Sequence, residues 1–182
     1  LVAQFNLYDR FSMMIGREIA NAGDGFSAGI TIKLNNLEEE SLIRKLYEAS
    51  NAGVRIQLIV RGICRLIPGV RGQSENIVVH RIVDRYLEHG RIFIFQNRGN
   101  REIFLGSADW MTRNIFHRVE VCFPLYDPVA KEQIMHIIGL QLRDNVQAVS
   151  IGPSLENQPI TGIVPPLASQ QAIYEYLGNA GH

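Results

Sequence analysis

The spacing of apolar residues predicts alternating helices and strands in the first third of the chain. Residues 5–22 carry apolar side chains at helical spacing, and this helix should end at the glycines of 23–25. Residues 29–34 and 55–60 are short apolar runs typical of buried strands, and residues 38–51 between them read as a helix with Glu in its first turn. A strand-helix-strand unit of this length predicts two parallel strands with a right-handed crossover.

The rest of the chain predicts shorter elements. Gly and Pro residues predict a loop at 61–75, followed by an extended segment at 76–83 and a turn or short helical piece at 84–88. The N-R-G-N sequence predicts a hairpin turn between two strands. The remaining predicted elements are strands at 91–96, 101–105 and 118–125, helices at 127–143 and 169–178, and an irregular connection at 152–166. The predicted class is α/β, a mixed β-sheet flanked by helices.

Composition narrows the class of protein. A length of 182 residues suits one domain, and 20% charged residues are ordinary for a soluble protein. No apolar run reaches the roughly 18 residues that cross a bilayer, and no signal-peptide pattern opens the chain. The chain begins at Leu1, in what reads as mid-helix, so we expect a fragment of a longer protein. Cys64 and Cys122 are expected to be reduced core residues, although two cysteines could pair.

Charge is distributed unevenly, although the net charge is zero. Residues 55–118 contain eleven Arg, no Lys and five Asp or Glu, a local charge of +6, which leaves −6 for the remainder. The planar Arg guanidinium suits paired phosphate oxygens, so this segment predicts an anion-binding face. The alternative is a solvated surface on which some Arg pair with acidic neighbours. Aromatic residues are not interleaved with the basic ones as nucleic-acid stacking would require.

Candidate chemistry gathers at predicted strand ends. Arg61 follows the strand at 55–60, at the edge where ligands bind in open α/β sheets. His89 and Arg91 stand at the mouth of the next strand, where both could point at a phosphate or simply face water. Ser107 and Arg113 follow a later strand, beside Gly106, and could serve phosphate oxygens or only shape the loop.

For the other candidates a structural role is expected. His80, His117 and His136 lie within or beside apolar segments, and Trp110 is expected to anchor the packing beneath its loop. Arg61 could likewise be a loop arginine that caps carbonyl groups, and His89 a satisfied polar residue.

The order His-x-Arg, strand, hairpin, strand, Gly-Ser resembles half of a phospholipase D-type site, whose motif is H-x-K-x4-D followed later by G-S. His89 and the Gly106-Ser107 pair match this motif. Arg91 replaces the lysine and Gln96 stands at the aspartate position, which puts phosphodiester hydrolysis in doubt. That superfamily also needs two such halves, and this chain contains one.

A closer resemblance covers nearly the whole chain. The blocks I-V-R-G-I-C-R-L-I-P-G-V, S-E-N-I, I-V-D-R-Y-L-E-H and S-A-D-W-M-T-R-N, at 59–70, 74–77, 82–89 and 107–114, resemble the last domain of bacterial polyphosphate kinase. G-I-T-I-K-L-N-N-L at 29–37 and R-V-E-V at 118–121 agree with it, whereas the tail after residue 146 resembles it little beyond Q-A-I-Y-E-Y.

The resemblance implies a single C-terminal phospholipase D-like domain over residues 1–182, in a chain of four domains. It implies reversible transfer of the ATP γ-phosphate to polyphosphate, with Mg²⁺ bound mainly outside this chain and a phosphohistidine in a preceding domain. Arg61 of I-V-R-G and His89 of Y-L-E-H then lie at the ATP-binding site, with Ser107 and Arg113 as lesser phosphate contacts. The isolated fragment is expected to be inactive.

The expected partners are ATP or ADP, inorganic polyphosphate and the preceding domains of the same chain, in a homo-oligomer without nucleic acid. The expected location is cytoplasmic, including the inner face of the membrane. Two other functions stay open, a phospholipase D-like phosphodiesterase half and a non-catalytic module that binds polyanions. The sequence leaves open the preferred reaction direction, the role of the tail after residue 146, and whether His89 acts in proton transfer or in positioning.

Overall fold

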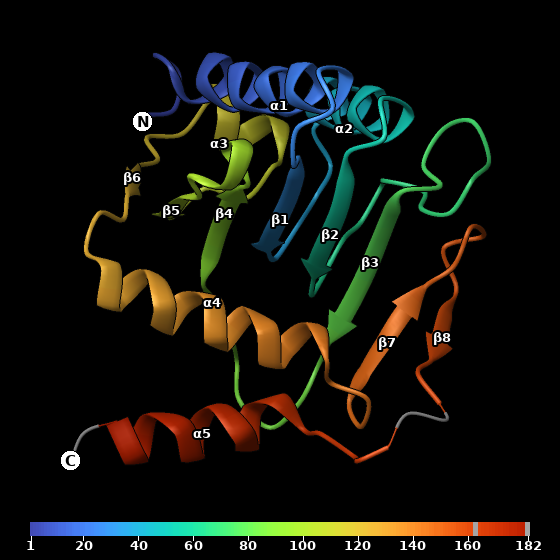
Figure 1. Cartoon of the computed structure of the whole chain (residues 1–182), viewed down its shortest axis with the longest axis vertical. Coiled ribbons are helices and arrows are strands. Elements are labelled where there is room, and N and C mark those ends of the chain that lie inside the picture. Colours follow the sequence, from blue (N-terminus) through green and yellow to red (C-terminus); the bar gives the residue numbers. More distant parts are fainter. Residues whose placement is uncertain (162–163, 181–182) are drawn as a thin grey trace.

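One mixed β-sheet organises the fold (Figure 1). The computed structural model describes residues 1–161 and 164–180. The helices are α1 (Leu7–Gly23), α2 (Glu40–Asn51), α3 (Thr112–Phe116), α4 (Pro128–Leu142) and α5 (Ser169–Ala180), with a 3-10 turn, η1 (Asn97–Gly99). The strands are β1 (Gly29–Leu34), β2 (Arg55–Val60), β3 (Ile77–Ile82), β4 (Arg91–Phe95), β5 (Glu102–Gly106), β6 (Cys122–Pro124), β7 (Ala148–Ile151) and β8 (Asn157–Pro159).

The order of the strands places the carboxyl ends of β1 and β2 side by side. The order across the sheet is β6-β5-β4-β1-β2-β3-β7-β8. β1 pairs in parallel with β2, and β2 with β3, whereas β4 runs antiparallel to β1. The predicted mixed α/β class and the parallel β1-β2 pair are therefore confirmed. The carboxyl ends of β1 and β2 meet at one edge of the sheet, beside the amino end of β4.

Helices α1 and α2 cover one face of the sheet (Figure 1). The centre of this core is aromatic, because Trp110 is fully buried with its ring centroid 5.4 Å from that of Phe11 and 5.9 Å from that of Phe93. Aromatic pairs at these separations add to the stability given by burial alone. Trp110 is thus the packing anchor that the sequence predicted.

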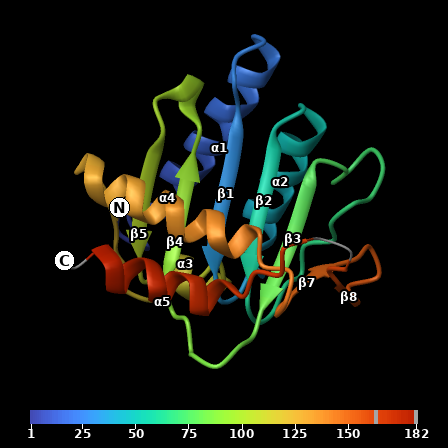
Figure 2. The same cartoon turned by 60° about the horizontal axis from the view of Figure 1, so that its bottom comes forward.

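Helix α4 crosses the opposite face of the sheet, and α5 packs beside α4 (Figure 2). Ile138 of α4 joins a second apolar cluster with Ile59 of β2 and Ile92 of β4. The ring of His136 stacks on Tyr176 of α5, with centroids 4.1 Å apart, which is a structural contact as expected. Helices therefore cover both faces of the sheet.

The predicted bounds hold best for the longest apolar patterns. The strands at 29–34 and 55–60 agree with β1 and β2, and the helices at 127–143 and 169–178 agree with α4 and α5 to within two residues at each end. Residues 84–88 form bends rather than a helical piece. Cys64 and Cys122 are both free, as expected. In the described part of the chain, no helix combines the length and the apolar character needed to cross a membrane.

Other predictions about local structure were wrong. Leu1 is not in mid-helix, because its amino group and carbonyl oxygen bond the backbone of Cys122 along the edge of β6. The strand predicted at 118–125 is reduced to β6, because Glu120 turns its carboxylate inward to bind Asn114. The connection predicted at 152–166 contains the end strand β8, and the short helix α3 was not predicted.

Candidate functional site

Asn35 joins the two residues that the sequence placed at the site. It follows β1, Arg61 follows β2 and His89 precedes β4, so all of them stand at the same edge of the sheet. Arg61 Nε donates to Asn35 Oδ1 at 3.0 Å, and Asn35 Nδ2 lies 3.4 Å from His89 Nδ1. The predicted approach of Arg61 and His89 is therefore seen, with an intermediary that the sequence analysis did not name.

This chain of contacts indicates which imidazole nitrogen of His89 carries the proton. An Arg Nε can only donate, so it must face the oxygen of the Asn35 amide, and the amide nitrogen then faces His89. Since an amide nitrogen also only donates, Nδ1 of His89 is the acceptor. The neutral imidazole of the exposed His89 accordingly holds its proton on Nε2.

A close approach of two loops brings Arg61 to Asn35. Gly62 N donates to Asn35 O at 2.7 Å, and Ile63 N donates to Asn36 Oδ1 at 3.0 Å. A Cβ on Gly62 would stand 2.7 Å from Asn36 Oδ1 and 3.0 Å from Asn35 O. Only glycine therefore fits directly after Arg61, which explains why the I-V-R-G sequence is suited to this loop.

Arg91 binds a carboxylate of this chain, so of the two orientations that the sequence left open, toward a phosphate or toward water, it takes neither. Its Nε and Nη2 atoms lie 3.2 and 3.1 Å from the two carboxylate oxygens of Asp109, and Nη1 donates to His89 O at 2.8 Å. Burial opposes ionisation of Asp109, but the hydrogen bonds from Arg91 and from Asn35 N outweigh it and lower the pKa of that carboxyl. Arg91 thus supports the backbone at His89.

Asp109 is the hub beneath the site. Besides Arg91, its carboxylate accepts from Asn35 N at 2.8 Å and from Asn36 Nδ2 at 3.2 Å. It therefore fixes the turn that carries Asn35 to the strand that follows His89. The only sequence signal for these residues was their position, because Asn35 and Asn36 directly follow a buried strand at its carboxyl end.

The positions of Ser107 and Arg113 leave their predicted roles as predictions. The Ser107 hydroxyl donates to Glu120 and accepts from Val121 N at 3.2 Å, so its proton is already engaged. The exposed Arg113 side chain contacts Met111 Sδ at 3.7 Å. The structure brings neither side chain into the hydrogen-bonded chain formed by Arg61, Asn35 and His89.

Two further positions of the phospholipase D motif, Gln96 and Gly106, also have structural partners. Gln96 directly follows β4, at the opposite end of that strand from His89, and accepts from Arg101 Nε at 3.1 Å. The chain at the start of β6 lies close against Gly106, since an added Cβ would stand 2.9 Å from Val121 O and 3.1 Å from Cys122 Cβ. The motif here therefore shapes the sheet around His89.

A buried ion pair lies under the site. Lys33 Nζ of β1 pairs with the Glu88 carboxylate, and it also donates to Gln141 Oε1 at 3.1 Å. Burial lowers the pKa of Lys33 and the nearby Arg61 charge adds to this effect, whereas Glu88 opposes it. Lys33, Arg61 and Glu88 line one small pocket, so this pair lies directly beneath the Arg61 side of the site.

These pairings leave one cation of the site for a ligand. Asp109 is paired with Arg91 and Glu88 with Lys33, whereas Arg61 has an amide oxygen as its partner and no carboxylate among the described residues. Its remaining guanidinium donors, together with Nε2–H of His89, suit an anion with several oxygens.

The same residues do not suit a divalent cation. No group of three or more His, Cys, Asp or Glu side chains in residues 1–161 and 164–180 is placed to hold a metal ion. Both oxygens of Asp109 are occupied by donors, and Mg²⁺ prefers free carboxylates. Asp109 is therefore not suited to bind Mg²⁺.

Two hollows flank the site. A groove of about 530 Å³ is lined by Gly90, Arg91 and Ser107 together with apolar residues of β5, β6 and α4, including Phe123. It lies next to His89 and is the more apolar of the two, which suits a packing surface more than a phosphate.

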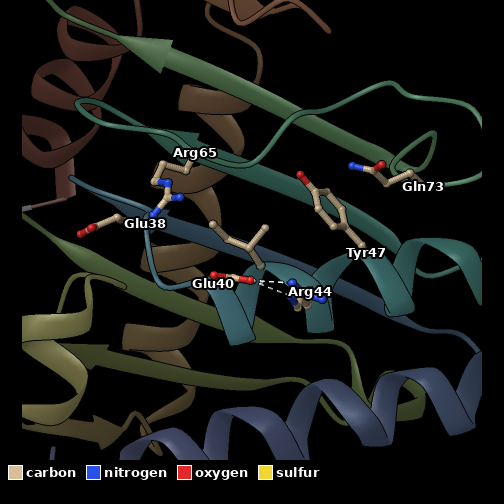
Figure 3. Close-up of a pocket in the computed structure, with 7 residues that line it drawn as sticks. Glu38, Glu40, Arg44, Tyr47, Arg65 and Gln73 are labelled. Atoms are coloured by element: carbon tan, nitrogen blue, oxygen red, sulfur yellow. Dashed lines mark hydrogen bonds and ion pairs between the residues drawn. The ribbon is translucent and has the colours of Figure 1, made fainter.

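The second hollow, of about 390 Å³, lies at the start of α2 (Figure 3). Arg44 Nη2 and Glu40 Oε1 form an ion pair there at 2.6 Å, and Arg65 reaches toward Glu40 from the loop after β2. With Glu38 as the other carboxylate, its formal charges balance. This hollow contains neither Arg61 nor His89, so we do not assign it to the site.

Comparison with known proteins identifies the family of this chain. The sequence profile of polyphosphate kinase C-terminal domain 2 matches residues 1–170. The chain is 51% identical over 172 residues to the polyphosphate kinase of Klebsiella pneumoniae, and 48% identical over 165 residues to that of Escherichia coli (strain K12). These alignments cover 94% and 90% of this chain but 24% of each relative, so the chain spans about a quarter of their length.

Solved structures give the same result. The crystal structure of polyphosphate kinase from Porphyromonas gingivalis superposes with a TM-score of 0.96 and 45% identity, over 99% of this chain and 28% of that chain. NucT from Helicobacter pylori shares the fold at a TM-score of 0.51 and 13% identity, over 75% of this chain and 89% of its own. The phospholipase D-like α/β fold expected from the resemblance is confirmed. The chain therefore belongs to the polyphosphate kinase family, and it corresponds to the C-terminal domain 2 of that family.

Proposed function

We propose that this chain supplies the ATP- and phosphate-binding half of a polyphosphate kinase site, in an enzyme that transfers the γ-phosphate of ATP reversibly to polyphosphate. The observation that carries the proposal is the contact chain from Arg61 through Asn35 to His89, which leaves an unpaired guanidinium and an Nε2–H donor at one sheet edge. Phosphoryl transfer asks a protein mainly to position the phosphates and to balance their charge.

The role of Arg61 in this proposal is to bind phosphate oxygens. Its Nε is held by Asn35, so the Nη groups keep a fixed direction and can donate to two oxygens at once. Preorganised donors of this kind stabilise charge that develops in the transition state, because they need no reorganisation during the reaction.

The role of His89 is to donate from Nε2. The donor can bind an oxygen of the leaving ADP, or an oxygen of the phosphoryl group held on the part of the enzyme outside this chain. Protonation of the imidazole would make it a general acid toward that oxygen. Arg91 and Asp109 keep the backbone at His89 in place, since Arg91 Nη1 donates to His89 O at 2.8 Å.

The remaining parts of the reaction belong to other domains in this proposal. The phosphohistidine stands in a preceding domain, Mg²⁺ enters with the nucleotide and is held there, and the assembled enzyme is a homo-oligomer. Arg91 is paired with Asp109, and Gln96 accepts a hydrogen bond from Arg101. These contacts count against a phospholipase D-like phosphodiesterase, in which the side chains at both motif positions would have to be available to the active site.

ATP-dependent polymer synthesis by the full-length enzyme tests the proposal. His89→Ala should lower kcat by roughly 10- to 1,000-fold, as expected for loss of one positioned donor. His136→Ala is the matched control, because that imidazole stacks on Tyr176 away from the site and should leave synthesis close to wild type. Wild-type kinetics for His89→Ala would show that His89 is not part of the site and would refute the proposal.

A further inference from the structure

The loop that carries His89 is poorly anchored by its apolar side chains. It connects β3 to β4 and runs past the start of α5 (Figure 2). Val83, Tyr86 and Leu87 are apolar or aromatic, yet 64%, 55% and 74% of their surface is exposed. Burial of these side chains therefore contributes little to holding the loop, and polar contacts must do so.

Gln170, in the first turn of α5, makes those contacts. Its Oε1 accepts from Tyr86 N at 2.8 Å, and its Nε2 donates to Tyr86 O at 2.8 Å and to Glu88 Oε1 at 3.1 Å. The carboxamide thus binds the loop backbone in both directions, as a neighbouring strand would. Gln170 is only 8% exposed, so these hydrogen bonds are largely shielded from competing water.

Glu88 extends the same connection to the sheet and to α4. Its Oε2 accepts from Lys33 Nζ of β1 and from Gln141 Nε2 of α4, while Oε1 accepts from Gln170. The residue directly before His89 is therefore held from three elements at once. Displacement of the loop would leave the Lys33 ammonium buried without its carboxylate, which is costly.

The start of α5 is itself fixed. Ser169 N donates to Asp144 Oδ2 at 2.7 Å, and Asp144 Oδ1 accepts backbone N–H groups from the segment before β7. Burial opposes ionisation of Asp144, but the backbone hydrogen bonds from Ser169, Gln147 and Ala148 oppose this effect, and the pKa of its carboxyl is lowered. Gln170 therefore projects from a rigid base.

We propose that Gln170 is a positioning residue for His89, and that α5 thereby forms part of the working site although it lies far along the sequence. By binding the Tyr86 backbone and the Glu88 carboxylate, Gln170 sets where the loop delivers the imidazole relative to Asn35 and Arg61. The inference rests on the proposed function of His89 and deepens it.

Gln170→Met tests the inference in the full-length enzyme. Met keeps the length and nearly the volume of Gln but can neither donate nor bridge the loop backbone. Gln171→Met is the matched control, because Gln171 is exposed and bonds only Glu175 of its own helix. We expect Gln170→Met to lower kcat by roughly 10- to 100-fold, the scale of a misplaced catalytic group. Gln171→Met should stay near wild type.

A double-mutant cycle separates positioning from general structural damage. If Gln170 acts through His89, Gln170→Met should cause little further loss in a His89→Ala background. An equal fractional loss in both backgrounds would overturn the inference, and so would equal kinetics for Gln170→Met and Gln171→Met.

Hydrogen exchange in the same full-length variants provides a readout besides activity. The backbone amides of residues 84–90 should exchange faster in Gln170→Met, while those of β1 stay as protected as in the wild type. Unchanged exchange at residues 84–90 would show that the hydrogen bonds of Gln170 do not hold this loop. A fully active His89→Ala variant would instead refute the proposed function. If His89→Ala is inactive but Gln170→Met is fully active, only the inference about Gln170 is refuted.

Discussion

Arg91 grips Asp109 through two hydrogen bonds, from Nε at 3.2 Å and from Nη2 at 3.1 Å. The two side chains are only 10% and 7% exposed, so the pair is shielded from solvent. The sequence left open whether this guanidinium points at a phosphate or faces water. The guanidinium instead pairs with the Asp109 carboxylate, which also accepts a hydrogen bond from Asn35 N. The pair therefore supports the site structurally.

Arg91→Ala should therefore act mainly on stability. The change leaves Asp109 buried without its cation, which costs about 3–5 kcal/mol. Urea denaturation of the 182-residue chain measures it. Arg44→Ala is the control, since its pair with Glu40 is exposed to solvent and should contribute far less. A loss of under about 1 kcal/mol for Arg91→Ala would show that the pair is not a main support.

Arg61→Lys should impair phosphoryl transfer in the full-length enzyme although the charge is kept. Lys cannot keep both the bond to Asn35 and a paired contact to phosphate oxygens, because it lacks the planar fork. The expected loss of rate in ATP-dependent polymer synthesis is roughly 10- to 1,000-fold. Wild-type kinetics would remove Arg61 from the site.

Asn35→Asp should inactivate the site while changing only one group. A carboxylate between Arg61 and His89 would pair with the guanidinium and favour a proton on Nδ1 of the imidazole. Both effects oppose phosphate binding, so we expect a higher KM for ATP together with a lower kcat. Steady-state kinetics of the full-length variant measure both, and a variant with unchanged KM and kcat would contradict the bridging role.

His89→Gln separates proton transfer from positioning. Gln keeps a hydrogen-bond donor but does not titrate, so it should remain as impaired as His89→Ala if the imidazole acts as a general acid. The measurement is the rate of polymer synthesis across pH in the full-length enzyme. Recovery of most activity with Gln would leave a positioning role and exclude the acid role.

The chain by itself should fold but should not synthesise polyphosphate. Its sheet buries apolar clusters on both faces, which is sufficient for one core. The phosphoryl-carrying histidine belongs to another domain in our proposal, so ATP bound at Arg61 has no covalent route onward. Incubation of the purified chain with γ-labelled ATP and Mg²⁺ checks this. Acid-labile label on one of its own histidines would contradict the assignment, and His89 would be examined first.

The sequence by itself determined the elements that are defined by local pattern. β1 and β2 match their predicted bounds because strands buried on both faces of a sheet read as continuous apolar runs. The helices with long amphipathic or apolar patterns were located for a similar reason. The sequence blocks that resemble polyphosphate kinase could also be recognised, because they are contiguous stretches and their recognition requires no knowledge of tertiary contacts.

Only the tertiary structure decided which polar groups are free. Arg61 and Arg91 look alike in the sequence, but Asp109, which is distant along the chain, neutralises one of them and leaves the other available. β7 and β8 were missed because they are short and half exposed, and their pairing comes from the neighbouring strand. Gln170 in the tail reaches the His89 loop across 84 residues. Such contacts join residues that are far apart in the sequence, so they depend on the tertiary fold and cannot be read from local residue patterns.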